Sequence, residues 1–155
     1  MKYILMLLCV CFFLTCIVNS DKKTELPKTW TKEFNITLHE GGGMRNASTT
    51  FFFSTDSCKY VEMEDGKDST WRFKLSPKEQ EEVSEKLNSF NVLAIESETT
   101  EITYDAETTT MCFNLDATKY FCSETGAASK IKERSAKSFS NAYTYLSNLA
   151  HEKSK

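Results

Sequence analysis

The chain has 155 residues, of which 40% are hydrophobic and 26% are charged, and its formal net charge is −3. This length corresponds to about one domain and excludes a multidomain enzyme. Five glycines and two prolines are too few for a collagen-like chain or a Pro/Gly-rich disordered chain. The excess of 22 acidic over 19 basic residues argues against nucleic-acid binding, which usually needs a basic excess.

Residues 1–20 have the pattern of a secretory signal peptide. Lys2 supplies a positive start, and residues 4–18 form an almost unbroken apolar segment. That segment is shorter than the roughly 20 apolar residues that a transmembrane helix needs. Small side chains at the end of the leader predict cleavage after Ser20, so that the mature chain begins at Asp21.

A lipoprotein signal is the alternative interpretation of the same leader, with Cys16 as the lipid-bearing residue. Thr15 departs from this pattern, because Gly, Ala or Ser usually precedes the lipidated cysteine. A lipid on Cys16 would tether the domain to a membrane, whereas cleavage after Ser20 would release it. Both interpretations predict an exported protein, located in the periplasm, in the cell envelope or outside the cell.

Removing the leader halves the number of cysteines from six to three and leaves a mature chain of net charge −4. The remaining cysteines are Cys58, Cys112 and Cys122. A three-residue loop centred on Ala117 would place Cys112 directly opposite Cys122 on the outer face of a sheet, where a disulfide is plausible in an oxidising compartment. Pairing of Cys58 with either of them, or three reduced thiols, are the alternatives.

Residues 21–32 form a polar linker whose end Trp30 could pin, and a single domain is expected over residues 33–152. Alternating or β-branched patterns predict four strands before the first helix. These strands are 33–38, 49–53, 58–63 and 70–75. Asp65-Gly66 between the last two favours a type I′ hairpin, whose register places Tyr60 opposite Trp71.

Ser76, Pro77 and Glu79 supply an N-cap, a first helical residue and a capping box for a helix that ends near Asn88 or Asn91. The expected elements after it are a short strand at 102–104, a hairpin of 109–115 with 119–123, and a long amphipathic helix at 129–152. The order β-β-β-β-α-β-β-β-α predicts an α+β fold. We expect an antiparallel sheet of about six to seven strands with two helices packed on one face.

The most unusual local sequence runs from His39 to Arg45. Its backbone N–H groups could form an anion-binding concavity, to which an arginine adds charge. A flexible connection between two strands is the alternative. The candidate binding residues are His39, Gly41, Gly42, Gly43 and Arg45.

Residues 96–107 are rich in carboxylates, which could face a cationic partner or bind Ca²⁺, although their spacing matches no EF-hand loop. The cysteines and histidines have no zinc-site spacing, and no catalytic triad motif is present. We therefore assign no metal, no cofactor and no catalytic residue. Asn35 and Asn46 begin glycosylation sequons, which matter only in a eukaryotic source.

Six short segments within residues 33–150 carry a family resemblance. They are Phe34-Asn-Ile-Thr-Leu, Gly41-Gly-Gly-Met, Ser57-Cys-Lys-Tyr, Asp65-Gly-Lys, Leu75-Ser-Pro-Lys-Glu-Gln and Ile102-Thr-Tyr-Asp. Together they are similar to segments of small exported proteins and lipoproteins of unknown function from Gram-negative bacteria. This resemblance implies export, often with lipid attachment, and brings no catalytic residues with it.

The leading hypothesis is an exported, non-catalytic binding domain of inhibitor-like character, monomeric, whose partner is a protein or an envelope component. The His39–Arg45 segment and one face of the sheet would form its contact surface. One alternative is a small secreted hydrolase that uses His39 and a carboxylate from residues 96–107. Another is a structural envelope protein without a discrete ligand.

Overall fold

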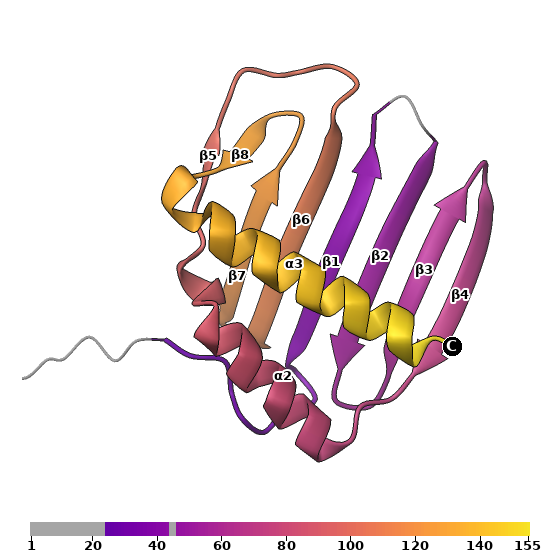
Figure 1. Cartoon of the computed structure of the whole chain (residues 1–155), viewed down its shortest axis with the longest axis vertical. Coiled ribbons are helices and arrows are strands. Elements are labelled where there is room, and N and C mark those ends of the chain that lie inside the picture. Colours follow the sequence, from indigo (N-terminus) through magenta and orange to yellow (C-terminus); the bar gives the residue numbers. More distant parts are fainter. Residues whose placement is uncertain (1–23, 44–45) are drawn as a thin grey trace, which may run out of the picture.

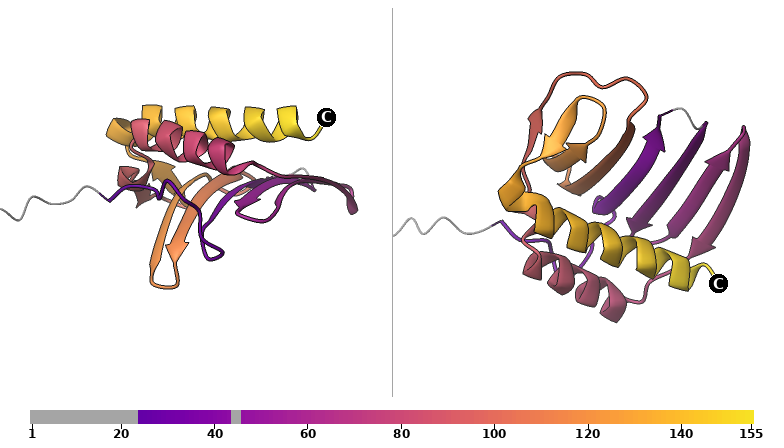
Figure 2. Two further views of the ribbon diagram at one scale, coloured as in Figure 1. Left: turned by 90° about the horizontal axis from the view of Figure 1, so that it is seen from below. Right: turned by 45° about the horizontal axis from the view of Figure 1, so that its top comes forward.

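The computed structural model describes residues 24–43 and 46–155. The predicted signal peptide 1–20, including Cys16, and the candidate residue Arg45 lie outside the described residues. The described chain forms two layers, a six-stranded antiparallel sheet and two helices that pack on the same face of it (Figures 1 and 2). The predicted α+β class is therefore confirmed.

The six strands lie in the order β4-β3-β2-β1-β6-β7, so β1 in the centre joins the N-terminal strands to the C-terminal hairpin. Their bounds are β1 Asn35–Gly42, β2 Ala47–Ser54, β3 Cys58–Glu64, β4 Lys67–Phe73, β6 Glu107–Asp116 and β7 Lys119–Thr125. Two short strands, β5 Ser97–Thr99 and β8 Ser129–Ile131, pair separately. The helices are α2 Pro77–Ser89, a 3-10 turn η1 Val92–Ala94, and α3 Glu133–Lys153.

Alternation along β1 determines which face of the sheet is buried. Phe34, Ile36 and Leu38 are fully buried beneath the helices, as the sequence predicts. The β3–β4 hairpin also has the predicted register, with Tyr60 opposite Trp71. Its two turn residues, Asp65 and Gly66, have φ angles of 52° and 76°, the positive values that a type I′ turn requires.

The predicted start of α2 is confirmed. The Ser76 side chain accepts a hydrogen bond from the Glu79 backbone N–H at 3.3 Å, and the Glu79 carboxylate accepts the Ser76 backbone N–H at 2.7 Å. This capping box satisfies two backbone donors that would otherwise have no partner. No helix within residues 24–43 and 46–155 is both long and apolar enough to span a membrane.

In the C-terminal half, the predicted start of the last helix and one predicted strand are wrong, whereas the helix itself is confirmed as α3. Residues 129–131 form β8 rather than the first turn of a helix, because they pair with β5 and Lys132 has the extended backbone angle ψ of 141°. The expected strand at 102–104 is instead a loop, since it has no partner strand among the described residues. Short strands without a long apolar alternation are difficult to place from sequence.

The described part of the predicted linker packs against α2. The Asn88 side chain accepts the Leu26 N–H at 2.8 Å and donates to the Leu26 carbonyl at 3.1 Å. The Trp30 indole N–H donates to the buried Ser84 hydroxyl at 2.8 Å. Leu26 and Trp30 are both buried, so residues 26–30 contribute to the hydrophobic core.

The disulfide joins Cys112 of β6 to Cys122 of β7, which lie directly opposite each other. Their Cα atoms are 4.2 Å apart. Phe113 and its partner Phe121 alternate to the helix-covered face, so the bridge lies on the opposite face, as predicted. Cys58 is a free, buried thiol on the helix side of β3, so its pairing with either of the other two cysteines is wrong.

An ion pair links the start of α2 to the end of α3 and makes stability depend on acid pH. Hydrogen bonds from the Lys153 ammonium group and then from Ser76 lower the pKa of Glu79 from 4.5 to about 2. The ionised carboxylate therefore stabilises the fold fully above about pH 4.5, and this contribution is lost as the pH falls towards 2.

We expect Lys153→Met to raise the pKa of Glu79 and to reduce the acid sensitivity of the unfolding midpoint. NMR titration of the Glu79 carboxyl carbon and urea unfolding between neutral and acid pH measure both effects. Lys155→Met, at an exposed position, is the matched control and should leave both unchanged. An unchanged Glu79 titration in Lys153→Met would contradict the assigned cause.

Candidate functional site

Three connections meet at one end of the sheet, which we call the loop end. They are the chain that leaves β1 at Gly43, the Asp65–Gly66 turn between β3 and β4, and the loop 100–106 before β6 (Figure 1). Helix α3 crosses the strands below this end, so it does not cover them there (Figure 1). Connections held by a rigid sheet are common places for binding residues.

The loop 100–106 exposes two large apolar side chains. Its backbone is held to residues 127–128, since the Thr100 and Thr103 N–H groups donate to carbonyls there at 2.9 and 2.6 Å. Ile102 is 67% exposed and Tyr104 is 86% exposed. The loop therefore presents apolar area to solvent from an anchored backbone.

Gly42 and Gly43, at the end of β1, pack directly against this loop. Gly42 and Gly43 have φ angles of 94° and 70°, values that residues other than glycine rarely adopt. A Cβ atom on Gly43 would lie 3.1 Å from the Asp105 carbonyl oxygen. Glycine at this position thus lets the backbone at Gly43 approach the loop 100–106 closely.

The expectation that His39–Arg45 is a loop is wrong for its first four residues. His39, Gly41 and Gly42 belong to β1, because that strand continues to pair with β2 and β6 as far as residues 41 and 42. Deleting Gly41–Gly43 would therefore remove paired residues from the central strand. Point substitutions test this region better than a deletion.

His39 lies on the face of the sheet opposite the helices and is exposed. Its Nδ1 atom is 2.9 Å from the Thr50 hydroxyl. Within residues 24–43 and 46–155, no carboxylate oxygen lies within 4 Å of either imidazole nitrogen of His39. The structure does not bring His39 and the acidic stretch together as an acid–base pair.

Two carboxylates of the acidic stretch 96–107 are used inside the molecule. Glu96 pairs with Lys132 at 2.6 Å and with Arg134, and these partners, Arg134 first, lower the pKa of Glu96 to about 2. Glu98 pairs with Lys130 at 3.1 Å. In the part of the chain that the structure describes, no group of three or more His, Cys, Asp and Glu side chains could hold a metal ion.

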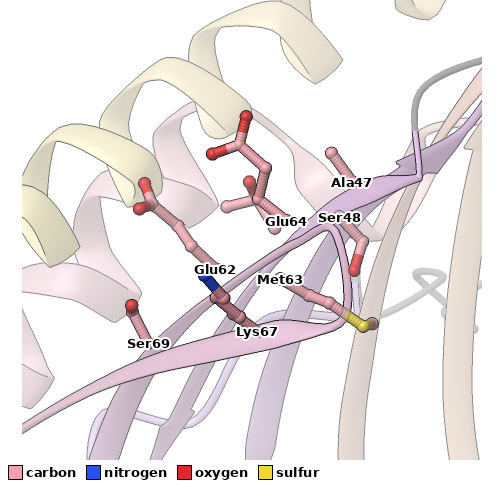
Figure 3. A pocket seen from close by; sticks show the side chains of 8 residues that line it. Ala47, Ser48, Glu62, Met63, Glu64, Lys67 and Ser69 are labelled. Atoms are coloured by element: carbon pink, nitrogen blue, oxygen red, sulfur yellow. The ribbon is translucent and has the colours of Figure 1, made fainter.

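A shallow cavity of about 410 Å³ wraps over the loop end of β2, β3 and β4. Glu62, Glu64 and Ser69 project on the side of α3, whereas Met63 and Ser48 project towards the opposite face (Figure 3). Both glutamates are exposed, and Met63 is 42% exposed. This cavity adds two carboxylates, the ammonium group of Lys67 and one apolar side chain to the surface at the loop end.

A second cavity of about 240 Å³, shallow and open to solvent, lies between α3 and the central strands. Its lining residues are Glu40, Thr109, Phe139, Ser140 and Tyr143. The Tyr143 hydroxyl donates a hydrogen bond to the Glu40 carboxylate. Burial of the phenol, followed by this bond, raises the pKa of Tyr143, so the phenol stays protonated.

The sequence reasoning named neither Glu40 nor Tyr104 as a site residue, although a signal for Glu40 was present. Glu40 is the next residue of the inward series that begins with Ile36 and Leu38, so alternation directs a carboxylate to the core face. Tyr104 gave no such signal, because its exposure follows from the absence of a partner strand within the part of the chain that the structure describes.

No family model matches the sequence, and none of the curated proteins compared with it is similar. We therefore assign function from the geometry of the loop end and of the two cavities.

Proposed function

We propose that this protein is an exported, monomeric, non-catalytic binding domain that contacts a protein or an envelope component through its loop end. The observation that carries the proposal is the exposure of Ile102 and Tyr104, at 67% and 86%, on a loop anchored by backbone hydrogen bonds. Tyrosine and neighbouring apolar side chains frequently supply most of the affinity of a protein interface.

The position of the loop end supports a role in contacting a partner. The N-terminal segment packs along α2, and β1 runs from there towards the loop end (Figure 1). A domain tethered through Cys16 would thus present the loop end away from the side on which its N-terminus is attached. The Cys112–Cys122 disulfide is compatible with an exported protein.

The hydrolase alternative is less well supported, because His39 contacts a threonine hydroxyl and no carboxylate within the described residues. A purely structural envelope protein would favour a uniformly polar surface. The exposed pair Ile102 and Tyr104 departs from that expectation.

The proposal is tested with the mature chain from Asp21, immobilised and incubated with an extract of the source's envelope and secreted proteins. We expect the wild type to retain a defined component and Tyr104→Ala to retain at least about tenfold less of it, the loss typical of an aromatic interface residue. Quantitative mass spectrometry of the retained material measures the ratio.

Tyr120→Ala is the matched control. Tyr120 is 65% exposed but lies at the opposite end of the sheet, beside the β6–β7 turn. It should retain the component as the wild type does. Equal retention by all three proteins, or no retention by the wild type, would refute the proposed surface.

A further inference from the structure

The 240 Å³ cavity beside α3 is separate from the loop surface proposed above and has its own chemistry. Glu40 of β1 and Thr109 of β6 are direct neighbours in the sheet register. Phe139, the exposed Ser140 and Tyr143, on successive turns of α3, line the cavity with them. The volume is slightly below the roughly 300–1,000 Å³ of sites for drug-sized ligands, so the cavity suits a smaller molecule.

A carboxylate at position 40 breaks the pattern of the strand that carries it. The preceding inward residues, Ile36 and Leu38, are fully buried, and the alternation calls for another apolar side chain. Placing a half-buried carboxylate here costs free energy unless it is paired. Departures from the local pattern of this kind are expected at functional positions.

The negative charge of Glu40 is only partly satisfied. Its hydrogen-bond partner among the described residues is the Tyr143 hydroxyl, which is neutral because the phenol keeps its proton. Within residues 24–43 and 46–155, no lysine, arginine or histidine nitrogen lies within 4 Å of this carboxylate. The cavity thus combines a carboxylate with no cationic partner in the described chain and the hydroxyls of Thr109 and Ser140.

We propose that this cavity binds a primary ammonium group carried on a short aliphatic stem, as in an alkylamine or a lysine side chain. Three N–H donors of an ammonium ion match the carboxylate of Glu40 and the hydroxyls of Thr109 and Ser140. The apolar stem would lie against Phe139, whose ring also attracts a cation. A quaternary ammonium ion lacks the N–H donors and a neutral alcohol lacks the charge, so both should bind less well.

The test titrates the mature protein with n-butylammonium chloride at constant ionic strength and follows backbone amide shifts by NMR. We expect saturable shifts at Glu40, Thr109 and Ser140, with a dissociation constant in the millimolar range typical of one small ligand on one carboxylate. n-Butanol and tetramethylammonium should each bind at least about tenfold more weakly.

Glu40→Gln is the decisive variant, since the amide keeps an acceptor for the Tyr143 hydroxyl while removing the charge. It should weaken n-butylammonium binding at least about tenfold without lowering the unfolding midpoint. Glu62→Gln is the matched control, because Glu62 lies on the same face but outside this cavity and should bind as the wild type does.

Tyr143→Phe keeps the aromatic ring and frees the Glu40 oxygen that accepts the Tyr143 hydroxyl. Binding of n-butylammonium should therefore persist. This variant thus separates the effect of the Glu40 charge from an effect on folding. Absence of saturable shifts, equal binding of n-butanol or tetramethylammonium, or equal losses in Glu40→Gln and Glu62→Gln would each overturn the proposal. None of these outcomes bears on the Tyr104 surface, which is tested with different variants and a different probe.

Discussion

Replacing Trp30 by alanine is expected to lower the free energy of unfolding by about 3–5 kcal/mol, the range observed when a buried aromatic side chain is truncated. Trp30 is only 4% exposed, and its ring centroid lies 4.7 Å from that of Phe34. The substitution also removes the indole N–H that donates to the buried Ser84 hydroxyl. Urea unfolding of the mature chain measures the loss.

Two further variants identify the origin of this loss. Trp30→Phe keeps most of the apolar area but lacks the N–H, so it should cost less than Trp30→Ala. Trp71→Ala removes a half-buried tryptophan from the edge strand β4 and should also cost less. A loss below about 1 kcal/mol in Trp30→Ala would show that residues 26–30 act as the linker that the sequence predicts.

Sequence patterns that span a few residues predicted the structure correctly where one short motif determines the backbone geometry. Asp65-Gly66 requires two positive φ angles, and this single requirement set the register of β3 and β4 residue by residue. The capping residues Ser76 and Glu79 set the start of α2 in the same way. The order of these strands within the sheet was not predicted, because pairing of β1 with β6 joins segments far apart in the chain.

Predictions from local sequence patterns failed where a contact with a distant part of the chain decides the structure. The polar composition of residues 21–32 indicated a linker, yet Asn88 and Ser84 of α2 hold Leu26 and Trp30 in the core. Ile102 and Tyr104 alternate as a strand would, but no neighbouring strand pairs with them in the described chain. Because the sequence predicted a strand there, it did not predict that Ile102 and Tyr104 are exposed.

The structure of the candidate binding residues 39–43 also depends on distant parts of the chain. The glycine run lies at the loop end of the sheet, and Gly43 approaches the loop 100–106 there. The sequence could not show that β1 continues through His39 and Gly41, because the pairing partners that extend it lie in β2 and β6. The cavity at Glu40 depends on α3, a helix about a hundred residues further along the chain.

Removing the disulfide with Cys112→Ala and Cys122→Ala together is expected to lower the free energy of unfolding by up to about 3 kcal/mol. The bridge closes a loop between positions separated by 10 residues, which restricts the unfolded chain by roughly that amount in the chain-entropy account. The native hairpin already aligns the two strands, so the folded state should change little. The sheet and both helices have a sizeable buried core without the bridge, and the double variant should therefore still fold.

Reduction of the wild type supplies an independent measurement of the same quantity. Dithiothreitol should lower the urea midpoint of the wild type to that of the double variant and should leave the double variant unchanged. Cys58 does not confuse this comparison, because it is already a free thiol and dithiothreitol does not change it. A midpoint that does not move on reduction would mean that the paired strands β6 and β7, rather than the covalent bridge, hold this edge of the sheet.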